Sequence, residues 1–206
     1  MGIGFTHLFS HKNPGMKSAL VFCGANSGNH PLYAETAREV GQQLAQRDIR
    51  LIYGAGKVGL MGEVAEGALQ AGGEVVGVIP FFLRKAEVCH EGLSHLYVVD
   101  SMHERKIKMA QLSDAVIVLP GGYGTMDEVF EMLTLAQVGQ GQHPVCFLNV
   151  NGYFDLLLKQ LDHMEAEGFL KPVHRKLTMT ASSLPELFEQ LEAYEAPPKE
   201  GKWIKL

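Results

Sequence analysis

Short apolar runs alternate with longer amphipathic stretches along most of the chain. The runs are rich in Val, Ile and Leu and are too short for helices, which is typical of strands buried in a parallel sheet. The runs that we expect to form strands are Ala19–Cys23, Arg50–Tyr53, Glu74–Ile79, His95–Val99, Ala115–Leu119 and Val145–Asn149.

The stretches between these runs carry apolar residues at helical spacing. Pro31 suits a first helical position, and Ser101 with Glu104 forms a capping box, as does Ser183 with Glu186. We therefore predict helices over Pro31–Arg47, Gly59–Ala71, Ser101–Leu112, Met126–Val138, Tyr153–Glu167 and Leu184–Tyr194.

This alternation predicts the α/β class: a doubly wound, mostly parallel sheet with helices on both faces, of Rossmann-like type. No repeat or linker divides the sequence, so we expect a single domain over residues 17–195. Residues 1–16 are interpreted as a disordered leader, although Gly2 and Thr6 match an N-myristoylation pattern. Residues 196–206 are expected to form an extended arm.

Composition is that of an ordinary globular protein, with 46% hydrophobic and 20% charged residues among 206. The net charge of −5 argues against a general nucleic-acid binder, and no apolar run is long enough for a membrane span. Cys23, Cys89 and Cys146 form neither a disulfide framework nor a zinc pattern, which favours a cytoplasmic location. An anionic ligand would therefore have to be bound by local geometry.

The segment Pro120–Glu128, with the sequence PGGYGTMDE, lies between a predicted strand and a predicted helix. Its glycines allow backbone N–H groups to approach an anion, and the helix N-terminus adds about half a positive charge. Thr125 supplies a hydroxyl group, and Glu128 supplies a carboxylate in the first turn. The segment therefore predicts a phosphate site with an acid or base beside it.

A second glycine-rich segment, Gly54–Gly59, formally matches the dinucleotide fingerprint GxGxxG. That fingerprint requires an acid at the end of the next strand, whereas Glu74 lies at the start of that strand. NAD binding is therefore disfavoured. The glycines either allow a tight turn and close helix packing, or Gly54 and Gly56 help to hold a smaller nucleotide.

The sequence HEGLSH, from His90 to His95, nearly matches the zinc motif HExxH. Its spacing is one residue too long to place both histidines on one helix face. We therefore expect no metal site here.

The stretch Ser101–Lys106 begins a helix directly after a strand, so its N-terminus lies at the carboxyl edge of the sheet. Ligands of open α/β sheets bind at that edge, where the Pro120–Glu128 segment must also lie. A capped helix with a solvated charged face is the alternative interpretation. Two adjacent cations, Arg105 and Lys106, suit an anionic sugar.

These motifs carry a resemblance to a known family. Pro120–Glu128 resembles the PGGxGTxxE signature of the LOG ("lonely guy") family, and Met102–Lys106 is similar to its MxxRK element. Gly54–Gly62 resembles the family's other glycine loop, and the resemblance extends from about Lys17 to Tyr194. Many members were first labelled lysine decarboxylases. Better-characterised members are phosphoribohydrolases, which cleave the N-glycosidic bond of cytokinin nucleoside 5′-monophosphates or of AMP.

The resemblance implies that Arg105 and Glu128 form the catalytic pair and that the substrate is a small-molecule nucleotide. It also implies a homodimer or larger homo-oligomer, with active sites at or near the interface. The chemistry requires no metal or cofactor. The remaining residues assigned to the substrate site are Glu87, Lys106, Gly121, Gly122, Tyr123, Gly124, Thr125, Met126, Asp127 and Thr134, with Gly54 and Gly56 from the other loop. Asp127 stands where plant members usually have Glu, so the reach of its carboxylate is shorter.

Two further functions compete with hydrolysis. A non-catalytic carrier of a nucleotide or of molybdenum cofactor would need the loop but not the Arg105–Glu128 pair. A lysine decarboxylase would need pyridoxal phosphate on a lysine, for which Lys57, Lys106 and Lys108 are the candidates.

The sequence leaves open whether the base is adenine or N6-isopentenyladenine. An isopentenyl group needs an apolar pocket, and four apolar residues near the two motifs could line one or belong to the core. These residues are Met102, Met126, Met132 and Leu133.

Overall fold

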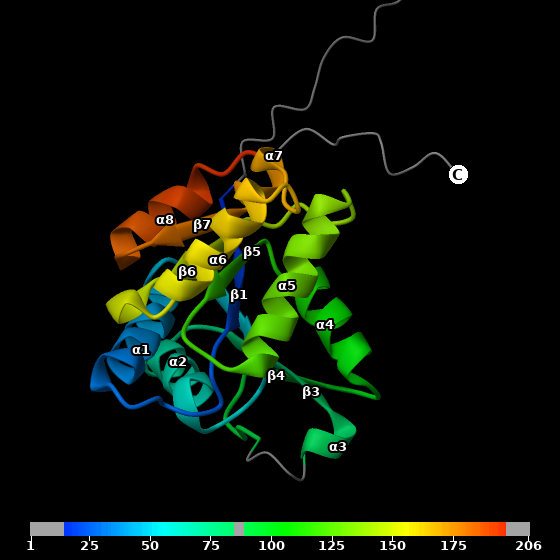
Figure 1. Cartoon of the computed structure of the whole chain (residues 1–206). Helices are drawn as coiled ribbons and strands as arrows, with labels where there is room; N and C mark the ends of the chain where they lie inside the picture. Colours follow the sequence, from blue (N-terminus) through cyan, green and yellow to red (C-terminus); the bar gives the residue numbers. More distant parts are fainter. Residues whose placement is uncertain (1–14, 85–88, 197–206) are drawn as a thin grey trace, which may run out of the picture.

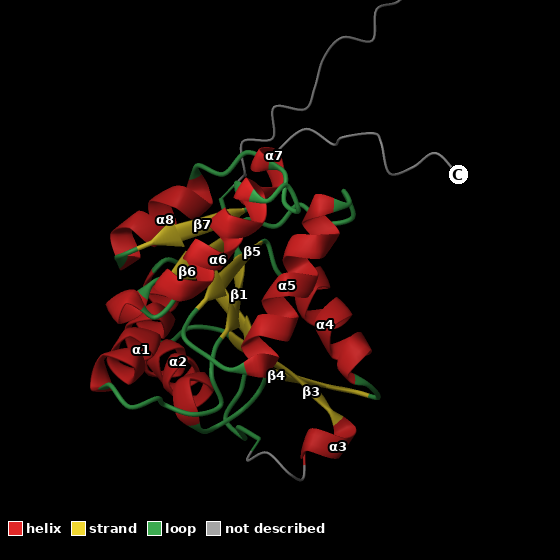
Figure 2. Cartoon of the chain, viewed as in Figure 1, coloured by secondary structure: helices red, strands yellow, loops and turns green. Residues whose placement is uncertain are grey.

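The computed structural model describes residues 15–84 and 89–196, which form a seven-stranded parallel sheet with helices on both faces (Figures 1 and 2). The strand order is β4-β3-β2-β1-β5-β6-β7. The predicted α/β class with a parallel sheet is therefore confirmed. The strands are β1 (Ser18–Phe22), β2 (Arg50–Tyr53), β3 (Val75–Pro80), β4 (His95–Val99), β5 (Ala115–Val118), β6 (Val145–Leu148) and β7 (Thr178–Ala181).

Helices cover the sheet in two layers. Apolar residues of α1, α2 and α8 pack in one core cluster, and those of α4, α5 and α6 pack in a second cluster on the other face. The long helices are α1 (Pro31–Gln46), α2 (Gly59–Gln70), α4 (Met102–Gln111), α5 (Tyr123–Gln137), α6 (Asp155–Ala166) and α8 (Leu184–Glu192). The short ones are α3 (Phe81–Arg84), α7 (Pro172–Arg175) and the 3₁₀ turn η1 (Val150–Gly152).

Two elements differ from the sequence-based expectation. Helix α5 begins at Tyr123 rather than at Met126, because Gly122 takes the N-cap position and the helix continues through Gly124. Strand β7 was not expected, since its sequence TMTA is half polar and lies, half-buried, at the edge of the sheet.

The strand order indicates where along the sheet a ligand would bind. The chain proceeds from β1 outward through β2 to β4, and then returns to pair β5 with the other side of β1. Phe22 at the end of β1 is in register with Val118 at the end of β5. The loops that follow these two strands therefore lie side by side, at the switch point where open α/β sheets bind ligands.

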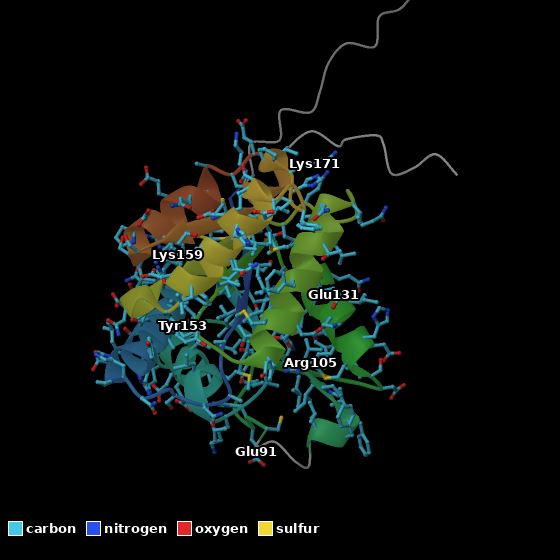
Figure 3. The ribbon with its side chains drawn as sticks, in the orientation of Figure 1. Glu91, Arg105, Glu131, Tyr153, Lys159 and Lys171 are labelled. Atoms are coloured by element: carbon cyan, nitrogen blue, oxygen red, sulfur yellow. The ribbon has the colours of Figure 1, made fainter. Side chains whose placement is uncertain are left out.

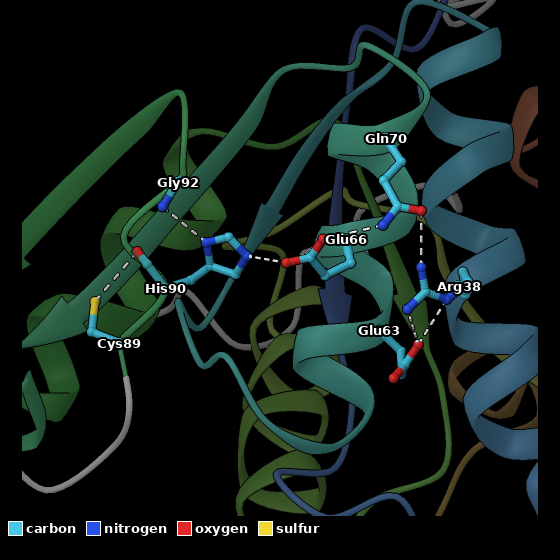
Figure 4. Close-up of polar contacts among 7 residues, drawn as sticks. All are labelled: Arg38, Glu63, Glu66, Gln70, Cys89, His90 and Gly92. Carbon is cyan, nitrogen blue, oxygen red and sulfur yellow. Dashed lines mark hydrogen bonds and ion pairs between the residues drawn. The ribbon is translucent and has the colours of Figure 1, made fainter.

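Helices α1 and α2 approach each other closely through glycines. A Cβ atom on Gly41 would lie 2.1 Å from the Val64 carbonyl oxygen, and one on Gly67 would lie 2.1 Å from the Arg38 carbonyl oxygen. On the surface of the same pair, Arg38 forms an ion pair with Glu63 at 2.8 Å (Figure 4).

Within the part of the chain that the structure describes, no helix combines the length and apolarity needed to cross a bilayer. The predicted leader up to residue 14 and the arm from residue 197 lie outside the described residues. Met16, which we expected to be the last residue of the leader, is buried in the core.

Candidate active site

A cavity of about 360 Å³ opens at the switch point between β1 and β5. The loop after β1 forms one wall, the loop between β5 and α5 forms another, and α4 contributes one arginine. The lining residues are Cys23, Gly24, Ala25, Asn26, Ser27, Gly28, Tyr33, Leu60, Met61, Arg105, Pro120, Gly121, Gly122, Gly124, Thr125, Glu128 and Tyr153.

The glycine-rich segment forms the N-terminus of α5 at this cavity. A Cβ atom on Gly121 would lie 2.1 Å from Thr125 Oγ1 and 2.9 Å from the Gly24 nitrogen, so only glycine fits there. The first N–H groups of a helix lack partners within the helix, and they carry its positive dipole end. The cavity therefore presents a set of backbone donors suited to a phosphate group.

Arg105 is held rigidly beneath the cavity and is only 6% exposed. Its Nε donates to the Val78 carbonyl at 3.0 Å, and its Nη2 donates to the Gly54 carbonyl at 2.9 Å. These carbonyls lie near the carboxyl ends of β3 and β2, which places the guanidinium group at the binding edge. Its third nitrogen, Nη1, lies 3.8 Å from Glu128 Oε1.

Glu128 projects into the cavity from α5, with its side chain 12% exposed. Because α5 begins at Tyr123, Glu128 lies in the second turn rather than in the first. The Arg105–Glu128 ion pair is thus buried on both sides and adjoins the glycine loop. The structure brings these two residues together across one cavity, in agreement with the placement of both motifs at the carboxyl edge of the sheet.

Cys23 also lines the cavity, directly after β1. Burial raises the pKa of its thiol far above the ordinary value, and the Glu128 charge raises it further. The thiol therefore stays protonated, which argues against a nucleophilic role.

A second group of predicted site residues lies elsewhere. Five of them line a separate, open hollow of about 700 Å³ between α4 and α5, together with Phe130, Glu131 and Leu135. The five are Lys106, Tyr123, Met126, Asp127 and Thr134.

Lys106 is neutralised in this hollow, which has two acidic side chains. Its Nζ forms ion pairs with Glu131 and, at 3.2 Å, with Asp127. The hydrogen bond to Glu131, followed by the one to Asp127, raises the pKa of Lys106. Met132 is buried in the core beneath α5, and Leu133 packs against that core. Of the four candidate apolar residues, Met126 alone lines this hollow.

Neither Gly54 nor Gly56 lines the cavity. A Cβ atom on Gly54 would lie 2.1 Å from Arg105 Nη2, and one on Gly56 would lie 2.5 Å from the Met61 methyl carbon. These contacts agree with the interpretation of this loop as a site of close packing. Glu74 pairs with Arg50 at 2.8 Å at the opposite end of the sheet from the cavity, so its carboxylate is out of position for an NAD ribose. Glu87 lies outside the described residues.

The two histidines of the zinc-like motif have different partners. His90 is buried, and its Nε2 contacts Glu66 Oε1 at 3.0 Å while its Nδ1 accepts from the Gly92 N–H (Figure 4). His95 lies in β4, 3.6 Å from Glu74. Among the described residues, no cluster of three or more His, Cys, Asp and Glu side chains could hold a metal ion.

Sequence reasoning missed two parts of the cavity. The loop Cys23–Gly28 carries no charged motif, so only its position after β1 could have indicated it. Tyr33 and Tyr153 come from the start of α1 and the segment before α6, and their rings meet edge to face with centroids 5.8 Å apart.

An open parallel sheet with an anion-binding helix N-terminus at its switch point defines a nucleotide-binding α/β protein. Residues 61–191 match the family described as "Possible lysine decarboxylase". A rice protein (Oryza sativa subsp. japonica) named probable cytokinin riboside 5′-monophosphate phosphoribohydrolase LOGL9 is 48% identical over 174 residues, covering 84% of this chain and 77% of the rice protein. The Arabidopsis thaliana phosphoribohydrolase LOG7 is 45% identical, covering 87% and 82% of the two chains. The chain therefore belongs to the LOG family.

Solved structures resemble the fold at lower identity. The molybdenum cofactor carrier protein of Chlamydomonas reinhardtii superposes with a TM-score of 0.65 at 22% identity, covering 86% of this chain and 98% of the carrier. The molybdenum cofactor binding protein of Rippkaea orientalis gives a TM-score of 0.64 at 23% identity, covering 85% and 96%. These likenesses support the Rossmann-like fold.

Proposed function

We propose that this protein hydrolyses the N-glycosidic bond of a nucleoside 5′-monophosphate, releasing the free base and ribose 5-phosphate. The observation that carries this proposal is the buried Arg105–Glu128 pair, 3.8 Å apart, beside the donor-rich N-terminus of α5. The LOG relatives carry names for this reaction on cytokinin riboside 5′-monophosphates.

In this mechanism the phosphate binds first and orients the sugar. The backbone N–H groups at Gly122–Thr125 hold the 5′-phosphate, and this contact, which is the same before and during the reaction, keeps the ribose in the cavity. A nucleoside, which lacks the phosphate, is therefore a poorer substrate than the monophosphate.

Glu128 acts on the bond that breaks. Cleavage builds positive charge on the ribose ring, and a carboxylate about 4 Å away stabilises that charge by roughly 4 kcal/mol at an effective dielectric constant of 20. This corresponds to about a thousandfold in rate. Glu128 also orients the attacking water and accepts its proton, as carboxylates do in glycosidases, while the departing base takes the electron pair of the broken bond and gains a proton from solvent.

Arg105 supplies the positive charge of a guanidinium group. Two of its nitrogens are occupied by the Val78 and Gly54 carbonyls, so the guanidinium group has one fixed orientation. It fixes the Glu128 carboxylate and contacts the phosphate or the ribose hydroxyl groups.

Decarboxylation of lysine fits these residues poorly. A Schiff-base lysine has to lose its proton, whereas Lys106 is held protonated by Glu131 and Asp127 and lies outside the cavity. Lys57 is exposed, and Lys108 lies over the Tyr97 ring at 4.4 Å. No described lysine lines the cavity, so pyridoxal phosphate would have no attachment point there.

The direct test incubates the protein separately with AMP and with N6-isopentenyl-AMP and measures ribose 5-phosphate. We expect turnover of at least one of them, and loss of about a thousandfold in Glu128→Gln. Glu131→Gln, which alters a carboxylate in the other hollow, is the matched control. Equal background rates in wild type and Glu128→Gln would contradict the proposal. Co-purified nucleotide or cofactor without turnover would favour a carrier instead.

We further propose that two copies pair through the outer surface of α4 and α5. Helix α5 buries Val129 and Met132 in the core, yet Leu135 on the same helix and Val138 at its C-cap are exposed to 36% each. Ile107 on α4 adds an apolar side chain that is 43% exposed. A second copy is the occupant that the family resemblance implies for such a surface.

A further inference from the structure

Tyr153 contacts the phosphate loop from a segment remote in sequence. Its hydroxyl group donates a hydrogen bond to the Gly121 carbonyl at 2.6 Å, and its ring lines the cavity. Figure 3 shows Tyr153 on the segment that enters α6, beside the ribbon of α1 and away from the α4 side that carries Arg105. Nothing in the Pro120–Glu128 motif itself indicates this partner.

The bond fixes the orientation of one peptide group. In a trans peptide the carbonyl and the following N–H point in opposite directions, so the Gly121 carbonyl determines where the Gly122 N–H points. Gly122 is the N-cap residue of α5, and its N–H stands at the start of the donor set. Both flanking residues are glycines, which rotate freely unless a partner restrains them.

The bond also removes an unfavourable dipole. A carbonyl oxygen directed at the cavity would repel a phosphate, whereas one bonded to a hydroxyl group is compensated. The preceding carbonyl, of Pro120, likewise accepts a hydrogen bond, from the Gly24 N–H at 2.9 Å. Two consecutive carbonyls of the loop are thus bonded to neighbouring segments, which leaves the N–H groups of α5 to face the ligand.

The Tyr153 side chain is 43% exposed, and one edge of it rests against the core. Its ring packs edge to face on Phe154 at 5.0 Å, and Phe154 packs in turn on Phe147 at 4.9 Å. The turn before it has positive φ angles at Asn151 and Gly152, and the Asn149 side chain accepts from the Phe154 N–H at 2.8 Å. The hydroxyl group is therefore carried by a ring that packs on two core aromatic residues in series.

We propose that Tyr153 is a positioning residue that orients the Gly121–Gly122 peptide and thereby sets the affinity for the 5′-phosphate. This inference rests on the proposed phosphoribohydrolase function and deepens it. Because the phosphate is bound alike in the ground state and the transition state, the hydroxyl group acts on KM rather than on kcat.

The test is Tyr153→Phe, which removes the hydroxyl group and keeps the ring. On whichever monophosphate the wild type hydrolyses, we expect KM to rise by about tenfold, with kcat and Tm unchanged. Inhibition by ribose 5-phosphate should weaken by a similar factor, while inhibition by adenosine should not change. Tyr97→Phe, on a half-exposed tyrosine of β4, is the matched control and should behave as wild type.

Two results would overturn the inference. An unchanged KM and ribose 5-phosphate affinity would show that the hydroxyl group is dispensable. A parallel fall in kcat and Tm, with inhibition by both ligands weakened alike, would indicate a merely structural role. Failure of the wild type to release ribose 5-phosphate would instead contradict the proposed function, so the two ideas fail separately.

Discussion

Adjacent residues have different partners at this site, because helices turn them to different sides. Glu128 and Asp127 are neighbours in sequence, but successive residues of a helix are rotated by about 100°. Glu128 therefore faces Arg105 in the cavity, and Asp127 faces Lys106 in the other hollow. The two residues are adjacent in the sequence motif, but their side chains take part in different ion pairs.

The fixed guanidinium group leads to a prediction at Arg105. Arg105→Lys keeps the charge but cannot contact the Val78 carbonyl, the Gly54 carbonyl and Glu128 together. The free energy of one hydrogen bond to a charged group corresponds to a change in rate of roughly ten- to a hundredfold. We therefore expect kcat for ribose 5-phosphate release to fall by that factor. Arg38→Lys, on the surface of α1, serves as the control. Near-wild-type kcat in Arg105→Lys would show that the charge alone suffices.

Among the elements, close contacts between helices α1 and α2 are sensitive to single methyl groups. Gly41→Ala would place Cβ at 2.1 Å from the Val64 carbonyl oxygen, so the helices have to separate. Overpacking of this kind costs about 1–3 kcal/mol, and we expect urea denaturation to show a loss of that size in the free energy of unfolding. Gly72→Ala, where a Cβ meets nothing within 4 Å, tests the separate effect of a positive φ angle. A Gly41→Ala protein as stable as wild type would mean that the helix pair relaxes without cost.

The elements also show what the sequence can and cannot predict. Six strands were predicted because each contains an apolar run. Strand β7 lies at the edge of the sheet, and its half-polar sequence contains no such run. Glycine disfavours helices, so the sequence indicates a start of α5 at Met126, whereas in the structure Gly122 caps the helix and Gly124 lies in its first turn. The Cys23–Gly28 wall of the cavity depends on β1 lying beside β5, which no local pattern encodes.

At the scale of the whole molecule, the proposed pairing of two copies makes a measurable prediction. Wild-type protein at micromolar concentration should sediment as a species larger than the 22.6 kDa chain. Ile107→Asp places a charge on the exposed surface of α4 and should shift the population toward monomer, because a buried unpaired charge opposes association. Leu156→Asp, on the exposed side of α6, is the control. Monomeric wild-type protein would contradict the pairing.

The central place of β1 has a consequence for how the chain reaches this structure. One side of β1 pairs with β2, which follows soon after it, but the other side pairs with β5, whose residues begin at Ala115. During synthesis one edge of this mostly apolar strand therefore stays unpaired until more than half of the polypeptide has emerged. Such waiting edges recruit other chains, so recovery of native protein should depend on how quickly the second half arrives to occupy that edge.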